Sequence, residues 1–498
     1  MVRKNLVANL IGQIFQSILA IALIPIYIEY LGIESYGLIG VFITLQACLS
    51  LLDLGITPAL GREMSLFTGN ARSRRSLLDL LRSVEILAVA LAIIMVLSAI
   101  IISNYIALKW LKSEGLEVST VANSLKIMGA VASLRFIEGV YKSSIYGLQQ
   151  QVWVNIVNTI IGILRSFGAI LVLMYISKTI EAFFVWHGLI SILTLILYYL
   201  KTYRLIGEKN YTGKWSISAL ISIRGFASGM IGITIIGLLL TQVDKIILTK
   251  ILSLTNFGYY TLAGTVSNSL YMLIGPIAQA IYPRLCELNA LQMKEEFCNV
   301  YHKGAQLVSI IAGAAAIVII IYSEKILILW TANSKLSESV APIVSFLTIA
   351  NIINGIYWIP YQAQLAVGWT NLTLKLGATA VIIMVPIMIM ATYHWGILGA
   401  TSSLIFTQIS YVSFGIYIMH KKILKDQLYD WMIIDIIHPL GACIIFVLLY
   451  KMLLLYSEIK LNSYLELTLV SFGAIFTAFI FAKDVRAIAI EMVLKKLK

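Results

Sequence analysis

The chain alternates between long apolar stretches and short polar ones. Runs of about 20 or more mostly apolar residues recur along it, and each is long enough to cross ~30 Å of hydrocarbon as a helix. The expected spans cover residues 5–31, 36–61, 83–107, 121–147, 151–176, 180–200, 225–250, 257–283, 304–323, 340–367, 370–393, 396–419, 431–456 and 463–482. The pattern therefore predicts an all-α polytopic membrane protein with about fourteen transmembrane helices.

The connections between these spans are too short to hold a separate catalytic domain. Each is shorter than about 25 residues, whereas an independent domain typically needs about 50 or more. The sequence contains no phosphate-binding glycine loop with a lysine, no HExxH and no GxSxG motif, and its four cysteines have neither metal-site nor disulfide-framework spacing. We therefore expect no enzyme activity, no metal site and no tightly bound cofactor.

The positive charge is distributed as membrane topology requires. The formal net charge is +13, and 24 of the 37 Lys and Arg residues fall in segments on the side of the two termini. Nine fall on the opposite side and four inside expected spans. Because cytoplasmic segments are enriched in Lys and Arg, both termini should be cytoplasmic. This distribution favours topology over nucleic-acid binding as the origin of the charge.

A weak internal repeat predicts the domain organisation. A shift of 221 residues places segment 30–64 over segment 251–285, so that Tyr36 meets Phe257 and Gly37 meets Gly258. Repeats with the same orientation imply two parallel six-helix lobes with a substrate path between them. The expected parts are an N-terminal lobe 1–203, a basic cytoplasmic linker 204–224, a C-terminal lobe 225–422, accessory spans 423–482 and an amphipathic cytoplasmic tail 483–498.

The repeated segments also carry a family resemblance. PIYIEYLGIESYGLIGVFITLQACLSLLDLGITPALGRE resembles the first two helices of the polysaccharide-exporter (Wzx-type) flippases of the MOP superfamily, and DKIILTKILSLTNFGYYTLAGT resembles their seventh and eighth. The resemblance implies a V-shaped, MATE-like transporter of the bacterial inner membrane. It also implies a lipid-linked oligosaccharide as substrate, usually on undecaprenyl diphosphate. Membrane lipids and the polysaccharide polymerase machinery are the other expected partners.

Charged residues inside the fourth and fifth spans are the first candidates for a substrate site. Arg135, Glu138 and Lys142 follow one another at spacings of three and four, with Tyr146 one turn further, so they share one helical face. Arg165 lies near the middle of the next span. An unpaired charge in the membrane is costly. The cations either neutralise a diphosphate or an acidic sugar, with Glu138 positioning them, or form a charge cluster that holds helices together.

Three further charged residues have two interpretations each. Asp244 and Lys245 are neighbours in the seventh span, so they should point about 100 degrees apart and pair poorly with one another. Lys245 either reaches the cavity or anchors helices. Asp244 is either a coupling or gate residue or, with Lys245, an anchor between helices. Asp53, close to Gly55 and Pro58, either joins a proton or sodium coupling site or locks the inner gate through Arg62 or nearby arginines.

Uncharged polar residues suggest sugar contacts. Asn9, Gln13 and Gln16 form a stripe along the first span that would be wasted against lipid. In the tenth span, Asn354, Trp358 and Tyr361 place an amide beside aromatic rings. Flat rings next to amides suit hydroxyl-rich substrates, although amides also join transmembrane helices and Trp and Tyr also mark the interface.

Three function classes follow from these observations. A flippase for undecaprenyl-diphosphate-linked oligosaccharide, such as an O-antigen repeat unit, needs a cationic cavity and short loops, as this chain has. A cation-coupled multidrug antiporter of the same superfamily is the alternative, but a cavity for cationic drugs should be acidic. A membrane-bound polymerase or glycosyltransferase should carry a large outer loop, and none is present in the sequence.

Overall fold

The computed structural model describes residues 15, 18–53, 55–68, 73–206, 211, 213–369, 371–456, 462–487 and 490, without the side chains of 226–233, 236 and 240. Its contacts divide the chain into two compact units, Met1–Gly258 and Tyr259–Lys498. The lobes, linker and accessory region expected from the sequence stay a prediction. Nine helical stretches of the described residues are long and apolar enough to cross a membrane. The protein is therefore a multi-pass helical membrane protein, and the number of its spans stays a prediction.

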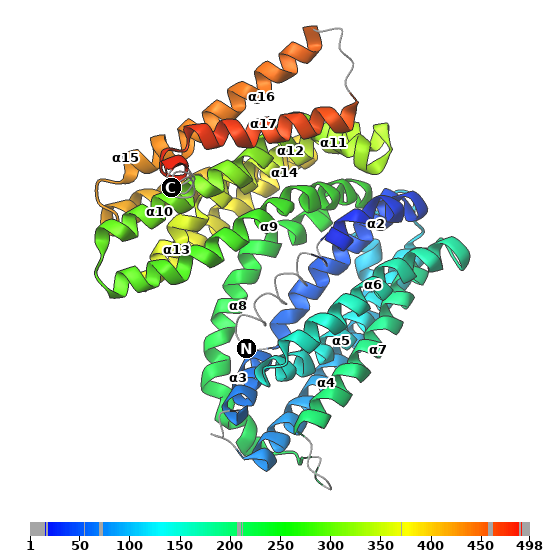
Figure 1. Ribbon diagram of the computed structural model, residues 1–498. Helices are drawn as coiled ribbons and strands as arrows, with labels where there is room; N and C mark the ends of the chain where they lie inside the picture. Colours follow the sequence, from blue (N-terminus) through cyan, green and yellow to red (C-terminus); the bar gives the residue numbers. More distant parts are fainter. Residues whose placement is uncertain are drawn as a thin grey trace. The chain divides into compact units, whose positions relative to one another are not determined.

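The first unit is a helical bundle (Figure 1). Its elements are α2 (Ile24–Leu49), a 3-10 turn (Ser50–Asp53), α3 (Ile56–Thr68), α4 (Arg74–Tyr105), a π-helical turn (Ile106–Trp110), α5 (Val118–Gly147), α6 (Gln151–Tyr175), α7 (Ile180–Ile206) and α8 (Ile217–Ile251). Helix α5 packs against α3, α4 and α7, and α8 packs against α2, α3 and α4. Helix α5 is therefore surrounded by protein, which makes it a suitable position for polar side chains.

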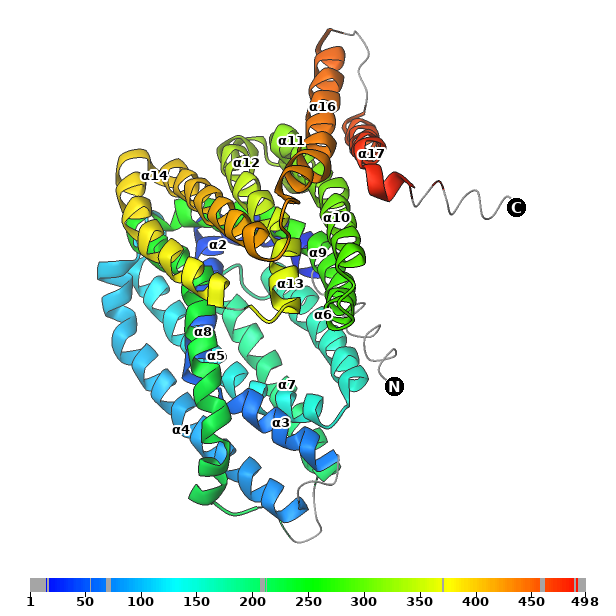
Figure 2. The ribbon, with the colours of Figure 1, turned by 90° about the vertical axis from the view of Figure 1, so that its left-hand side faces the viewer.

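The second unit is also helical. The helix α9 (Leu254–Ala290) begins in the first unit and continues into the second, and is followed by α10 (Lys294–Val308), a π-helical turn (Ser309–Gly313), α11 (Ala314–Thr331), α12 (Ser334–Ile356), α13 (Trp358–Ala366), α14 (Asn371–Lys422), α15 (Leu428–Asp430), a π-helical turn (Trp431–Ile437), α16 (His438–Tyr456) and α17 (Ser463–Phe481). Helices α16 and α17 pack against each other and against α11 (Figures 1 and 2).

Two glycines mark span boundaries that the hydrophobic pattern predicted. Gly32 interrupts α2 with φ +80°, and Gly396 interrupts α14 with φ +58°. Both angles lie in the left-handed region, which glycine adopts without the cost of a Cβ clash. The expected boundaries at 31–36 and 393–396 coincide with these breaks, so α2 and α14 each contain two helical segments joined by a glycine.

The second expected span, 36–61, is not one continuous helix. A 3-10 turn covers Ser50–Asp53, Gly55 has φ +71°, and α3 begins at Ile56. Pro58 therefore falls in the first turn of α3, where a missing backbone N–H costs no intrahelical hydrogen bond. The hydrophobic pattern predicted one continuous helix over residues 36–61, but Gly55 and Pro58 divide this segment.

The two glycines that the repeat aligns contact each other within the first unit. A Cβ on Gly37 would lie 3.3 Å from the backbone nitrogen of Gly258, and a Cβ on Gly258 would lie 3.3 Å from that of Gly37. A larger residue at either position would also collide with a carbonyl oxygen of the facing helix, that of Leu254 or of Ile33. Glycine at both positions thus allows the two backbones to approach closely.

A buried polar network joins the C-terminal helices to α10. His302 Nδ1 lies 2.5 Å from a carboxylate oxygen of Asp435, and its Nε2 lies 2.9 Å from the side-chain oxygen of Gln427. The Gln306 amide donates to both Asp435 and Asp484, at 2.8 Å each, and its oxygen accepts the Asp484 backbone N–H at 2.9 Å. We call these five residues the polar joint. Both nitrogens of His302 face acceptors, so its surroundings match the doubly protonated, cationic ring.

Candidate functional site

Arg135 connects three helices of the first unit. It lies in α5, donates from Nη1 to Gln46 of α2 at 2.9 Å, and donates from Nη2 to Nδ1 of His187 in α7 at 3.1 Å. Its guanidinium also lies 5.1 Å from the centre of the Phe42 ring. Since arginine has only donors, Nδ1 of His187 accepts and the ring proton is on Nε2. These contacts hold the Arg135 side chain in one position.

Three more charged residues lie around Arg135. Glu138 and Lys142 follow on the same face of α5, Arg165 comes from α6, and all three cations interact electrostatically with the Glu138 carboxylate. We call Arg135, Glu138, Lys142 and Arg165 the cation cluster. Its three cations and one carboxylate give it a formal charge of +2. The predicted grouping of these residues on adjacent helices agrees with their positions in the structure.

In and beside the cation cluster, three buried polar atoms lack a hydrogen-bond partner among the described residues. Glu138 Oε2, Arg165 Nε and His187 Nε2 are buried, and none has a hydrogen-bond partner among the residues that the structure describes. A buried polar group without a partner costs about 1–3 kcal/mol. These donors and this acceptor, which lack partners among the described residues, suit a ligand that supplies the complementary groups, above all an anion.

Tyr146, expected one turn beyond Lys142, lies against an apolar cluster. It is partly buried and packs on Tyr141, Ile145, Val154 and Tyr198. The hydroxyl of Tyr198 donates to Asn158 of α6 at 2.5 Å. This aromatic region continues the face of α5 that carries the cation cluster.

Asp53 lies at the helix break described above. One of its carboxylate oxygens accepts the backbone N–H of Thr57 at 3.0 Å, and the Thr57 hydroxyl also donates to it. Arg62, the partner suggested by the sequence, pairs with Glu63 at 3.0 Å. Asp53 therefore caps the first turn of α3, where a carboxylate also complements the positive end of the helix.

Asp244 and Lys245 pair with each other, which corrects the expectation from their adjacency. The Lys245 Nζ lies 3.8 Å from an Asp244 carboxylate oxygen and donates to the Thr241 carbonyl at 2.6 Å. The lysine stem is long enough to fold back along α8, so the angle between neighbouring Cβ atoms does not prevent the contact. Lys245 is thereby engaged within its own helix.

Amides and aromatic rings of the second unit form a hydrogen-bonded cluster. Asn354 donates to Gln408 at 3.0 Å, and its oxygen accepts from Trp358 at 3.3 Å and from Tyr271 at 3.3 Å. The Tyr271 and Trp358 rings stack with centroids 5.6 Å apart. Tyr361 packs against the neighbouring apolar cluster. The amides largely satisfy one another, so the cluster joins α9, α12, α13 and α14 while offering a stacked aromatic pair.

The remaining expected site residues lie outside the described part of the chain. They are Asn9, Gln13 and Gln16, so the polar stripe of the first span stays a prediction. Within the described ranges, no group of three or more His, Cys, Asp or Glu side chains is arranged as a metal site would require.

Sequence reasoning missed the residues that hold the cation cluster in place. Gln46 and His187 contact Arg135 from α2 and α7, at sequence separations of 89 and 52 residues. Both are polar residues inside apolar spans, and that was the available signal. The polar joint was also missed, although Asp435 is an acidic residue inside an expected span.

Solved structures of transporters share this fold. The lipid II flippase MurJ in an inward closed conformation superposes with a TM-score of 0.73 at 14% identity, covering 95% of this chain and 98% of that one. An inward-facing multidrug-resistance MATE family transporter of the MOP superfamily gives a TM-score of 0.64 at 12% identity, covering 83% and 96%. The chain thus shares the fold of these two solved structures.

Sequence comparison then identifies the family. The profile of the polysaccharide biosynthesis protein family matches residues 30–341, and the chain belongs to this family. A Shigella flexneri protein assigned as an O-antigen transporter is 22% identical over 403 residues, covering 80% of this chain and 93% of the relative. The resemblance to Wzx-type flippases seen in the sequence is confirmed.

Proposed function

We propose that this protein flips an undecaprenyl-diphosphate-linked oligosaccharide, such as an O-antigen repeat unit, across the bacterial inner membrane by alternating access. The observation that carries the proposal is the cation cluster, which has a formal charge of +2 and lies on apolar helices of the first unit. A diphosphate is the group that such a cluster would neutralise. Family membership and the similarity to an O-antigen transporter support a glycan as cargo.

The contacts suggest separate roles for the cations. Arg135 is already bound by Gln46 and His187, so it acts mainly as the scaffold. The Nε of Arg165 has no partner in the described ranges, and Lys142 extends the same face of α5. These two side chains are the diphosphate ligands in this proposal, because they can form charge-assisted hydrogen bonds without breaking an existing one. Glu138 positions them.

The remaining candidate residues complete the proposed mechanism. The stacked Tyr271 and Trp358 pair offers a surface for sugar rings. A proton or sodium gradient would act on the carboxylates of Asp53 and of Asp244, which pairs with Lys245. Both termini face the cytoplasm, and the flipped product would go to a polysaccharide polymerase on the other side.

A cation-coupled multidrug antiporter is the second candidate, because the fold is shared with a MATE family transporter. The charge of the cluster argues against it. A site with three cations and one carboxylate repels a cationic drug, and like charges in a partly desolvated site interact strongly. An anionic cargo fits the same geometry better.

The test replaces Arg165 and Lys142, each by Gln, in cells of the source bacterium that lack the wild-type gene. We expect surface glycan to fall by at least about tenfold, because each variant loses a charge-assisted hydrogen bond. Lipid-linked precursor should accumulate at unchanged membrane abundance. Lys126→Gln is the matched control, since Lys126 also lies in α5 but bonds Asn123 outside the cluster. Normal surface glycan in both cluster variants would contradict the proposal.

A further inference from the structure

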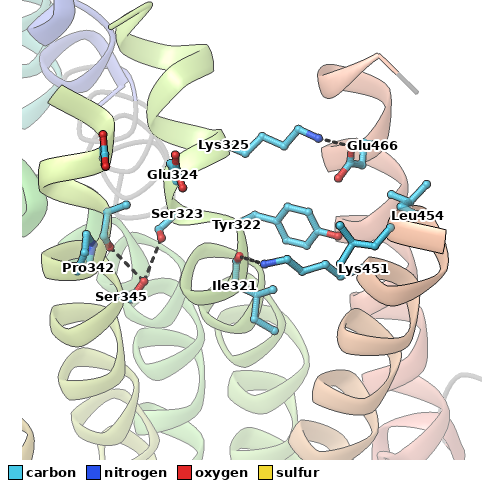
Figure 3. A pocket seen from close by; sticks show the side chains of 13 residues that line it. Ile321, Tyr322, Ser323, Glu324, Lys325, Pro342, Ser345, Lys451, Leu454 and Glu466 are labelled. Atoms are coloured by element: carbon cyan, nitrogen blue, oxygen red, sulfur yellow. Dashed lines mark hydrogen bonds and ion pairs between the residues drawn. The ribbon is translucent and has the colours of Figure 1, made fainter. Parts of the chain in front are cut away.

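A pocket of about 890 Å³ lies in the second unit, among α11, α12, α16 and α17 (Figure 3). This volume falls within the range of small-molecule sites, roughly 300–1,000 Å³. Its walls come from the middle of α11 (residues 321–325), the first half of α12 (338–345), the last turn of α16 (451–455) and Glu466 in the first turn of α17. None of these residues belongs to the cation cluster or to the hydrogen-bonded cluster around Asn354.

The pocket carries charges of both signs. Lys325 pairs with Glu466 across the gap between α11 and α17, whereas Lys451 points from α16 toward α11 and donates to the Ile321 carbonyl at 3.3 Å (Figure 3). Within the part of the chain that the structure describes, no carboxylate pairs with Lys451. Glu324 and Glu338 likewise line the pocket without a cationic partner there. The Lys451 Nζ also lies 5.6 Å from the centre of the Tyr322 ring, and Lys451, Glu324 and Glu338 are all exposed, so a ligand can reach these three charges.

The pocket borders an apolar cluster and exposed apolar side chains. Tyr322 belongs both to its wall and to the buried cluster that joins α11 to α16 and α17, which includes Val318, Val447 and Val470. Leu455 also lines the pocket and is 75% exposed, while the neighbouring Tyr456 is 89% exposed. Exposed tyrosines at the end of a transmembrane helix mark the level of lipid headgroups. The charged residues thus lie where a headgroup would be, beside a surface suited to an acyl chain.

We infer that this pocket binds a phospholipid with a phosphoethanolamine headgroup, its phosphate at Lys451, its ammonium at Glu324 and Glu338, and an acyl chain along Leu455. The two lysines and three glutamates of the wall give a formal charge of −1, which disfavours a headgroup that is only anionic. A primary ammonium donates hydrogen bonds to carboxylates, whereas a choline group has no N–H to donate. A zwitterion with a primary amine therefore complements the pocket best.

The lipid would bind between the accessory helices α16 and α17 and the rest of the second unit. Helices α16 and α17 lie outside the internal repeat, and the buried face of α17 toward α11 and α16 consists largely of small residues, among them Ala474 and Ala478. A headgroup bound to α11, α12 and α16 adds polar contacts beside this interface. This inference does not depend on the proposed flippase activity.

The test measures lipid adducts on the purified full-length protein by native mass spectrometry, after delipidation and addition of phosphatidylethanolamine, phosphatidylcholine or phosphatidylglycerol. We expect phosphatidylethanolamine to be retained at least about fivefold more than either other lipid, as a charge-assisted hydrogen bond supports. Lys451→Gln and Glu338→Gln should each lower its retention by about the same factor. Lys451→Arg should preserve it.

Lys335→Gln is the matched control, because Lys335 is exposed on α12 and does not line the pocket. Its lipid retention should equal that of the wild type. Equal retention of the three lipids, or unchanged retention of phosphatidylethanolamine in both Lys451→Gln and Glu338→Gln, would overturn the inference. Inorganic phosphate that displaces the lipid would support phosphate binding at Lys451.

Discussion

The cation cluster and the polar joint both bury charged side chains, but they differ in how those charges are satisfied. In the joint, the residues His302, Gln306 and Asp435 are at most 8% exposed, and hydrogen bonds link all three. In the cluster, positive charge exceeds negative charge, and buried atoms of Glu138 and Arg165 have no partner among the described residues. The joint satisfies its side chains with hydrogen bonds and stabilises the fold, whereas the cluster leaves polar atoms available to a ligand.

The cation cluster and the polar joint also differ in local backbone conformation. Asp435 lies in the π-helical turn Trp431–Ile437, and Gln306 lies just before the turn Ser309–Gly313. Such turns redirect side chains and leave carbonyls to be satisfied elsewhere. The cation cluster lies on the regular helices α5 and α6. The joint thus lies at irregular helix geometry, whereas the cluster lies on regular helices.

The largest expected effect tests the joint. His302→Leu leaves the buried Asp435 carboxylate without its cationic partner, so we expect the free energy of unfolding to fall by about 3 kcal/mol. Denaturant titration of the purified protein measures this change. His394→Leu is the control, because His394 is exposed on α14 and should change stability little. Equal stability of the two variants would show that the joint is not a stabilising network.

A smaller loss of stability is expected for Arg135→Leu. The change removes the hydrogen bonds to Gln46 and His187 but also relieves the electrostatic repulsion between Arg135 and Arg165. We expect a net loss of about 1–2 kcal/mol in the same titration. The comparison with Lys126→Leu, on the same helix, isolates these contacts. A stability equal to that control would show that Arg135 is not a scaffold.

The smallest effect on stability, with a large effect on transport, is expected for Arg165→Leu. Replacing a buried cation with incomplete hydrogen bonding by an apolar side chain should leave the free energy of unfolding unchanged or raise it by up to about 1 kcal/mol. Surface glycan should nevertheless fall as for Arg165→Gln. Stability and glycan export measured on the same variant separate the two roles. A clear loss of stability would instead place Arg165 among the structural residues.

Short-range patterns in the sequence predicted much of the helical structure. The expected span 151–176 is α6 (Gln151–Tyr175), and the expected span 463–482 is α17 (Ser463–Phe481). The helical spacing also placed Arg135, Glu138 and Lys142 on one face. These predictions depend only on hydropathy and on 3.6-residue periodicity, which act over a few turns of one helix. They failed where glycines and a proline divide one apolar run, as at Gly55.

The sequence did not predict which side chains of distant helices contact each other. The contacts of Gln306 with Asp435 and Asp484 bridge 129 and 178 residues, and no local periodicity relates such positions. The sequence likewise did not show that Lys245 folds back to Asp244. A side-chain conformation depends on what surrounds it, which spacing along one helix does not specify.

The sequence by itself determined that this chain is a polytopic helical membrane protein with a cationic pair of adjacent helices, because apolar length and charge are properties of the chain. Only the tertiary structure decided which buried charges are paired. It paired Arg135 with Gln46 and His187. Among the described residues it left the Arg165 Nε without a partner and placed the exposed Lys451 in a pocket beside Glu324 and Glu338. The physical reason is that pairing requires atoms within about 3 Å, a distance that packing sets between helices far apart in sequence.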